Sequence, residues 1–439
     1  MRLGLAISGG GHRAAVFGLG VLLYLADVQA NRDVVSISSV SGGSIANAHA
    51  GLAGYRTAGR DEFREAAGRL AAQIANRGTL FAWRGTWLFL GVLILALAAA
   101  VAIWWLPLWW VWRLVLFAVA FAAWEVLLVR RRGEVCGRAY RATVLQGAAT
   151  GRLTDLGGGD VDHVLCATHL HAGEHFYLAG EFVYSFRFGW GSPADLPLHV
   201  AVQASTALPG AFPPRWIRTR RFGLAGGPAP VPALVALVDG GVYDNMAEQW
   251  LTGLDSRRNV PAGVRRPDTL IVANASASMG MLPVRQIHWP LLGELFAFTR
   301  DSSIMYDNSA SIRKRDLVDR FDAIAAAPDR PGLGLPGCLL DIRSDPFAAA
   351  RAFQRADDSW PERAARARAV LARRPADWEG DGEFVSSVKT TLSKLGVETS
   401  ARVLHHAYTL AAMNLHLFLG MPLVDVPSRD EFVRLCRGA

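Results

Sequence analysis

Residues Val34 to Gly51 read VVSISSVSGGSIANAHAG. The β-branched start of this stretch predicts a strand over 34–38, and the small and apolar residues that follow predict a helix over 44–56. Ser41 stands between the two, directly before a pair of glycines. Such a turn is either an ordinary tight connection or a nucleophile elbow, whose strained backbone holds one serine hydroxyl out of the turn. An elbow requires small neighbours, because the strand and the helix pass close to the serine.

The segments around this stretch continue the alternation of strands and helices. Residues 3–8 predict a strand, residues 14–30 predict a helix, and another helix begins near Asp61 and ends near Asn76. The order β-α-β-α predicts an α/β domain with a parallel sheet. Further elements are predicted later in the chain: strands at 161–168, 174–188 and 268–274, a strand or helix start at 197–206 and at 231–238, and helices at 384–397 and 400–419.

The composition changes after the helix that ends near Asn76. Gly85 to Trp112 contains no charged residue, and Trp87 to Trp105 is long enough to cross a hydrocarbon core as a helix. A Leu-Pro pair follows, and Leu108 to Val129 forms a second apolar segment. Two segments that are apolar on all faces predict a transmembrane helical hairpin. The alternatives are a hairpin that dips into one leaflet and a buried pair of core helices.

The charges that flank these segments predict their orientation. Arg77 and Arg84 precede the first segment, arginines at 130–132 and 138 follow the second, and the tip between them carries only Arg113. By the positive-inside rule, both outer ends of the hairpin are cytoplasmic. The sequence therefore predicts a protein of the cytoplasmic membrane whose remaining domain lies on the cytoplasmic side.

A second glycine-rich turn, Ser8-Gly9-Gly10-Gly11-His12-Arg13-Ala14, lies between the first predicted strand and the helix that follows. Successive N–H groups at such a helix start converge on an anion, which is either a phosphate or the oxyanion of a reaction intermediate. The glycines also fit a dinucleotide-binding pattern. That pattern requires an acidic residue at the end of the second strand, whereas Asp33 precedes this strand.

A third turn contains Val238-Asp239-Gly240-Gly241, at the end of a predicted strand. Alone it is an ordinary Asp-Gly turn. With the other two it forms a set, because open α/β sheets bind their ligands at strand ends. The net charge of +8 comes without a dense basic cluster that contains aromatic residues, so nucleic acid is not an expected partner.

In this order the three motifs resemble those of the patatin-like phospholipase family. The matching residues are Gly-Gly-Gly-x-Arg at 9–13, the serine elbow at 39–43 and Asp-Gly-Gly at 239–241. The segment QASTALPGAFPP at 203–214 and the segment CATHL at 166–170 are also similar to family segments. Two positions depart from the pattern, since Ser39 and Ala14 stand where the family has glycine. Both replacements are small.

The resemblance implies a three-layer α/β/α domain with a mostly parallel central sheet, into which the two-helix transmembrane hairpin is inserted. On this view residues 1–85 and 131–345 form the two parts of the catalytic domain. Residues 86–130 form the hairpin, and residues 346–439 form a C-terminal helical region.

The resemblance also implies a serine lipid acyl hydrolase. Ser41 attacks the ester carbonyl, and Asp239 takes the serine proton directly, which requires that burial raise the pKa of this carboxyl. The implied oxyanion hole consists of Gly9, Gly10, Gly11 and Arg13: the oxyanion lies on the N–H groups of Gly10 and Gly11, and Arg13 anchors either the loop or the anion. Four glycines are expected to support the turns: Gly42, Gly43, Gly240 and Gly241. The implied partners are a membrane phospholipid or another acyl lipid and, through residues 87–129, the bilayer; neither a cofactor nor a metal is implied.

Other interpretations remain open at this point. A lipid acyltransferase with the same acyl-Ser41 intermediate shares every motif, and a catalytically silent membrane scaffold or lipid-binding protein shares the fold. His12 is either a third catalytic residue or a variable position beside the glycines. His169, His171 and His175 are interpreted as surface residues of a β-hairpin rather than as metal ligands.

Overall fold

The computed structural model describes the chain except for residues 277–292, 328–331, 333, 354–357, 374–380 and 439. Its strands are β1 (Leu3–Ile7), β2 (Val34–Val40), β3 (Asp162–His169), β4 (Glu174–Ala179), β5 (Val183–Ser185), β6 (Gly189–Gly191), β7 (Arg215–Arg218), β8 (Ala225–Gly226), β9 (Leu234–Asp239), β10 (Thr269–Asn274) and β11 (Gly337–Asp341). The described helices are α1 (Gly11–Asp27), α2 (Gly42–Leu52), α3 (Arg60–Asn76), α4 (Arg84–Ala102), α5 (Trp110–Leu127), α6 (Arg132–Thr143), α7 (Leu198–Ser205), α8 (Gln249–Thr252), α10 (Gly293–Ala326), α11 (Ala348–Ala352), α12 (Trp360–Arg373), α13 (Asp381–Ser387), α14 (Val397–Leu419) and α15 (Arg429–Arg437).

The strands form one mixed sheet with the order β11-β10-β1-β2-β3-β4-β5-β6-β8, and β9 joins β3 to β7. The strands from β11 to β3 pair in parallel, and the pairs beyond β3 are antiparallel. The α/β class and the mostly parallel central sheet predicted from the sequence are therefore confirmed.

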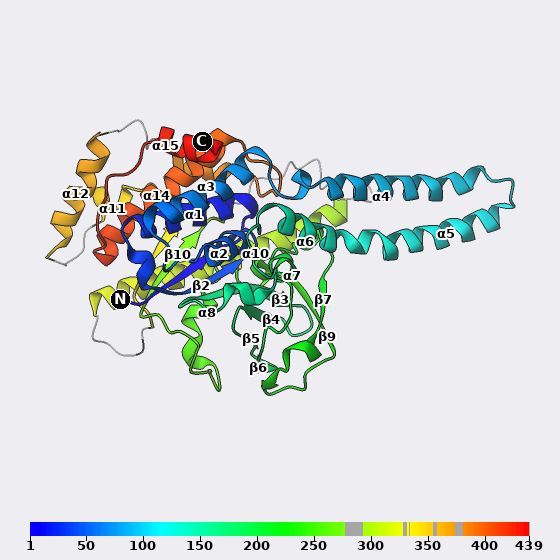
Figure 1. Cartoon of the computed structure of the whole chain (residues 1–439), viewed down its shortest axis with the longest axis horizontal. Coiled ribbons are helices and arrows are strands. Elements are labelled where there is room, and N and C mark those ends of the chain that lie inside the picture. Colours follow the sequence, from blue (N-terminus) through cyan, green and yellow to red (C-terminus); the bar gives the residue numbers. More distant parts are fainter. Residues whose placement is uncertain (277–292, 328–331, 333, 354–357, 374–380, 439) are drawn as a thin grey trace.

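Helices cover both faces of this sheet because its strands are buried on both sides. Along β1, Leu5 and Ile7 point into the larger apolar core, which they share with α1 and α14. Ala6 points the other way, into a second core that contains Trp250 of α8 and Phe321 of α10. Figure 1 shows α1, α3, α14 and α15 gathered on one side of the sheet. This is a three-layer arrangement.

The helices α4 and α5 leave this domain as an antiparallel pair that projects far from it (Figure 1). The two candidate membrane spans are Arg84–Trp105 and Trp110–Thr143, and only 11% and 0% of their most apolar windows are buried. Leu95 in α4 is 72% exposed and Val119 in α5 is 62% exposed. The alternative of a buried pair of core helices is therefore wrong, and both helices are long and apolar enough to cross a membrane.

Several predicted elements need correction. The helix predicted for 384–397 ends at Ser387 within α13, and α14 begins only at Val397. The chain between them is not helical because its backbone groups bond elsewhere: the Thr391 carbonyl accepts the N–H of His12, and the Leu392 carbonyl accepts that of Thr79.

The strand predicted for 174–188 divides into β4 and β5, joined by a turn in which the Ala179 N–H donates to the Phe182 carbonyl. The apolar segment at 197–206 is the helix α7. The described part of 346–439 is mainly helical, and the remainder of that expectation, at 354–357, 374–380 and 439, lies outside the described residues.

Candidate active site

The three sequence motifs meet at one edge of the sheet. Strands β1 and β2 are parallel neighbours, with Ile7 opposite Ser39, so the turns that follow them leave the sheet side by side. Strand β9 runs antiparallel to β3 and ends at Asp239, which pairs with Ala167. The preceding residue, Cys166, pairs with Val40 of β2. Asp239 therefore arrives beside Ser41, the residue after Val40.

The turn at Ser41 has the backbone of a nucleophile elbow. Ser41 adopts φ 50° and ψ −126°, a strained region for a residue with a side chain, and α2 begins at the next residue. A Cβ on Gly42 would lie 1.8 Å from the Gly11 carbonyl oxygen, and one on Gly43 would lie 2.6 Å from the Ile7 carbonyl oxygen. Both residues that follow the serine must therefore be glycine, because backbone occupies the space that a side chain would need.

Ser205, at the end of α7, accepts a hydrogen bond from the backbone of the elbow. The Ser41 N–H lies 3.1 Å from the Ser205 carbonyl oxygen and 3.2 Å from its Oγ. The Ser205 hydroxyl donates to the Cys166 carbonyl at 2.7 Å and lies 2.8 Å from the Ser44 hydroxyl. No role was predicted for Ser205, although its place in the QASTALPG segment could have indicated one.

The serine at position 39 is accommodated by a buried polar network. Asn47 donates to the Ser39 hydroxyl at 2.8 Å, and this hydroxyl lies 3.1 Å from that of Ser44. The Asn47 side-chain oxygen is in turn 2.8 Å from Nδ1 of His163. Because the extra hydroxyl is fully paired, a serine at this position does not leave a buried polar group without a partner.

Asp239 has the properties of a general base. Its side chain is buried, and Oδ1 accepts the Gly241 N–H at 2.8 Å. Burial raises the pKa of Asp239 to about 6, although the Ser41 hydroxyl and the Gly241 N–H act in the opposite direction as hydrogen-bond donors. Within the described residues Oδ2 has no partner at standard hydrogen-bond geometry. This oxygen is therefore available for the Ser41 proton, since such contacts often tighten only when substrate binds.

The glycine loop at the start of α1 offers two free donors. Gly10 and Gly11 have φ angles of 141° and 59°, so their N–H groups point in other directions than they would at an ordinary helix start. The Gly9 N–H donates to the Asn245 carbonyl and the His12 N–H to the Thr391 carbonyl, both at 2.9 Å. Among the described residues, no backbone carbonyl accepts a hydrogen bond from the Gly10 or Gly11 N–H group. The expectation for Gly9 is corrected accordingly: it contributes space, because its Cβ would lie 3.2 Å from the Ser41 Cβ.

Arg13 and His12 hold this loop in place. The buried Arg13 side chain donates to the carbonyls of Ala275 and Val388, so it anchors the loop. His12 Nδ1 lies 2.7 Å from the Ser393 carbonyl oxygen, and its Nε2 lies 3.1 Å from the Thr79 hydroxyl. Burial lowers the pKa of His12 to about 4. His12 is thus a neutral structural residue rather than a third catalytic one.

The expectation that the histidines near Gly173 lie on the surface is wrong for two of them. His169 and His175 are buried, and only His171 is exposed. The chain reverses between β3 and β4, so His175 pairs with Thr168 and points to the opposite face from His169. In the described part of the chain no group of three His, Cys, Asp or Glu side chains could hold a metal ion.

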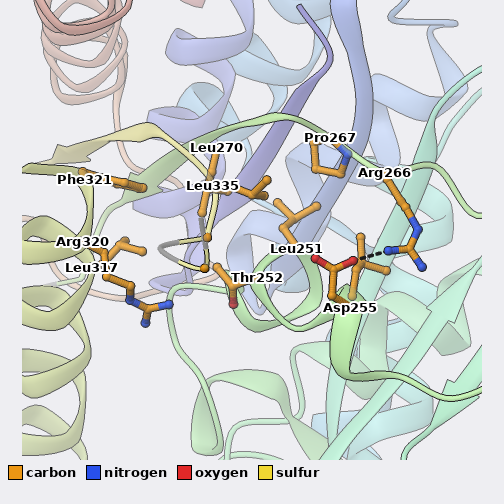
Figure 2. A pocket seen from close by; sticks show the side chains of 13 residues that line it. Leu251, Thr252, Asp255, Arg266, Pro267, Leu270, Leu317, Arg320, Phe321 and Leu335 are labelled. Atoms are coloured by element: carbon orange, nitrogen blue, oxygen red, sulfur yellow. Dashed lines mark hydrogen bonds and ion pairs between the residues drawn. The ribbon is translucent and has the colours of Figure 1, made fainter. Parts of the chain in front are cut away.

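A cavity of about 270 Å³ lies away from this edge (Figure 2). It is lined by Leu251, Leu270 and Leu335, and the ion pair between Asp255 and Arg266 closes one side. Leu270 pairs with Gly4 near the amino end of β1, whereas Ser41 follows the carboxyl end of β2. This cavity is therefore not part of the candidate active site.

Ser205→Ala removes the hydroxyl that supports the Ser41 amide and leaves the carbonyl contact. We expect the rate at which Ser41 reacts with a fluorophosphonate to fall by roughly tenfold, equivalent to about 1.4 kcal/mol of barrier. The control is Ser36→Ala, which removes another buried hydroxyl of the same domain, one that accepts from Trp250. Equal melting temperatures with unequal labelling rates would support positioning by Ser205, whereas equal labelling rates would contradict it.

The raised pKa of Asp239 predicts the pH dependence of Ser41. Only the ionised carboxylate accepts a proton, so the labelling rate should rise by about tenfold per pH unit below pH ~6 and level off above it. Stopped-time labelling of the full chain measures this profile. Asp239→Asn should lower the plateau strongly, and a wild-type rate that is unchanged between about pH 5 and about pH 7 would exclude Asp239 as the base.

This chain resembles a protein-family model and a solved structure. The family model described as patatin-like phospholipase matches residues 5–249. Human GIVD cytosolic phospholipase A2, a solved structure, aligns with 100% of this chain at 13% identity and a TM-score of 0.47, and the chain spans 60% of that protein. No curated protein matches. Because the family model covers more than half of the 439 residues, the chain belongs to the patatin-like phospholipase family.

Proposed function

We propose that this protein is a membrane-anchored serine lipid acyl hydrolase that cleaves acyl esters of membrane lipids. The observation that carries the proposal is the pairing of Ser41, on a strained elbow, with the buried carboxylate of Asp239, whose pKa is raised to about 6. An activated serine beside a base and free N–H donors is the arrangement that acyl transfer requires. Family membership supports the same reaction class.

The first half of the proposed reaction forms an acyl-enzyme. The Ser41 hydroxyl oxygen attacks the ester carbonyl while Asp239 Oδ2 takes its proton. The negative charge that develops on the carbonyl oxygen is stabilised by the N–H groups of Gly10 and Gly11 and by the positive end of α1. The tetrahedral intermediate then collapses: the bond to the alcohol oxygen breaks, and the alcohol leaves with the proton returned by Asp239.

The second half releases the fatty acid. A water molecule gives a proton to Asp239 and attacks the acyl-Ser41 carbonyl, and collapse of the second intermediate returns the proton to Ser41 and frees the acid. Transfer of the acyl group to an alcohol acceptor would use the same intermediate. Among the residues that the structure describes, no feature favours this acceptor over water, and hydrolysis is the reaction that we propose.

The hairpin supports a membrane location for this reaction. The candidate span Arg84–Trp105 has 22 residues, which at helical rise extend for about 33 Å and match a hydrocarbon core of about 30 Å. Arginines at both outer ends favour a cytoplasmic position for the catalytic domain. The substrate would therefore be a phospholipid or another acyl lipid of the membrane that the hairpin enters.

The bases of the hairpin adjoin the candidate site. Thr79, five residues before α4, contacts His12 of the glycine loop. On the return side, α6 packs on α7, the helix that ends at Ser205. These contacts support a site that is held close to the membrane surface rather than tethered at a distance.

Fluorophosphonate labelling of the detergent-solubilised full chain tests the chemistry. We expect the wild type to label and Ser41→Ala not to label. With phospholipid vesicles, the wild type should release free fatty acid, and a loss of about 10⁴-fold or more is expected for Ser41→Ala. A folded wild type that neither labels nor releases acid would support the silent scaffold. A product that carries the acyl group on an added alcohol would support the acyltransferase.

Charges placed on the hairpin test the membrane anchor. Leu95→Arg combined with Val119→Arg puts two cations on surfaces that are 72% and 62% exposed. Each arginine costs about 2.5–3.5 kcal/mol at a helix centre in a bilayer, so the double variant should leave the carbonate-washed membrane fraction. Leu170→Arg, at a 48% exposed apolar residue outside the hairpin, is the matched control and should stay there. Retention of the double variant in the membrane would contradict the anchor.

A further inference from the structure

A cavity of about 120 Å³ lies between α6 and α7, where the chain returns from the hairpin. The two helices approach closely because α6 presents Gly133 and Gly137 to α7. A Cβ on Gly133 would lie 2.9 Å from the Gln203 side-chain nitrogen, and one on Gly137 would lie 3.2 Å from the His199 ring. The polar side chains of the wall come from three elements: Glu134 and Arg138 of α6, His199 and Gln203 of α7, and Arg215 of β7.

The charge of this cavity is positive and only partly compensated. Arg138 and Arg215 both line it, and in the described residues no carboxylate lies within 4.0 Å of either guanidinium. Burial lowers the pKa of Arg215, and Glu134 raises it from a longer distance. Burial, followed by the charges of Arg141, Arg215 and Arg138, lowers the pKa of His199 to about 4, so this ring stays neutral. The cavity thus has two cations for one carboxylate.

Gln203 points to a missing ligand. Its side chain is fully buried, and neither its oxygen nor its nitrogen has a hydrogen-bond partner among the described residues. An amide that is buried without partners is costly, and native proteins rarely leave one unexplained. The amide N–H₂ group and the two guanidinium groups that line the cavity are donors that suit an anion with several oxygens. Arginine pairs form such bidentate contacts with phosphate.

The position of the cavity indicates where this anion comes from. Helix α6 begins at Arg132, soon after the apolar part of α5 ends at Leu127. Arg138 is six residues further, which places it within about 9 Å of the start of α6 along the helix axis. For a hairpin inserted in a bilayer, the cavity would lie at the aqueous border of the headgroup layer, which extends about 5–8 Å beyond the hydrocarbon core. The anion that is most abundant there is the phosphate of a lipid.

We propose that this cavity is a phosphate-binding site that takes the headgroup of an anionic membrane lipid, separately from the ester that Ser41 attacks. The inference rests on the part of the proposed function that inserts the hairpin into a membrane, and it does not depend on the reaction at Ser41. The phosphate oxygens accept hydrogen bonds from Arg138, Arg215 and the Gln203 amide. Glu134 balances part of the positive charge of the two arginines.

The test uses the full chain in detergent micelles, with Ser41→Ala present to prevent turnover. The probes are dioctanoyl phosphatidic acid, dioctanoylglycerol, which has the same acyl chains without phosphate, and inorganic phosphate. Binding is measured by isothermal titration calorimetry. We expect saturable binding of the phosphatidic acid, at least tenfold weaker binding of the other two probes, and a loss of at least tenfold with Arg215→Gln or Gln203→Leu.

The matched control is Arg218→Gln, which removes the same charge from the opposite face of β7 and should leave binding unchanged. Equal weakening by Arg218→Gln would show general surface attraction and overturn the proposal. Equal binding of dioctanoylglycerol would exclude a phosphate site, and equal binding of inorganic phosphate would overturn the lipid source. Binding that Gln203→Leu and Arg215→Gln both leave intact would place the lipid elsewhere and overturn the site.

A parallel measurement separates this proposal from the proposed function. Fluorophosphonate labelling of Arg215→Gln, Gln203→Leu and Arg218→Gln, each with Ser41 intact, reports whether the variants fold and whether the serine is activated. Phosphatidic acid binding by a chain whose Ser41 is unreactive would uphold the phosphate site while the hydrolase proposal fails. Normal labelling without specific phosphatidic acid binding would support the activated Ser41 and overturn the phosphate site.

Discussion

The candidate site depends on one steric constraint, the contact between the backbones of Gly42 and Gly11. A Cβ at residue 42 would lie 1.8 Å from the Gly11 carbonyl oxygen, so the two turns can meet only because residue 42 has no side chain. Helices α1 and α2 begin at these same two glycines, and the positive ends of both helices therefore lie beside Ser41. The steric fit and the electrostatic environment of the serine follow from a single contact.

In the proposed reaction, the same arrangement would allow a carboxylate to act without a histidine. Asp239 reaches Ser41 from β9, which pairs with β3 in the antiparallel sense just where β2 ends. There it is surrounded by protein, and burial outweighs the donors that face it, so its pKa lies near 6 instead of near that of an exposed aspartate. A more basic carboxylate is a better proton acceptor for a serine. His12 cannot take this role, because both of its ring nitrogens face partners in other segments.

Local patterns predicted the fold class, the motifs and their meeting at one sheet edge, because each depends on a strand, a turn and a helix that are contiguous in sequence. The roles within the glycine loop could not be predicted in this way. The Gly9 N–H donates to the Asn245 carbonyl and the His12 N–H donates to the Thr391 carbonyl. These partners are hundreds of residues away in the chain. The helix predicted for 384–397 was wrong for the same reason, since the Thr391 carbonyl in that segment accepts a hydrogen bond from the glycine loop. His169 and His175 were misjudged because polar residues in a predicted hairpin were assigned to the surface without knowledge of what packs on it.

The position of the hairpin follows from the direction of α3. Arg60 at the start of α3 contacts Asp27 at the end of α1, and Thr79, just beyond the end of α3, contacts His12 at the start of α1. The two helices are therefore antiparallel, and a chain that leaves α3 emerges at the edge of the sheet where the glycine loop lies. An apolar hairpin inserted at this point needs no linker to bring Ser41 near the surface that it enters. Inserted after α1, at the opposite edge, the same hairpin would hold Ser41 one domain thickness away from the membrane that we propose as the source of its substrate.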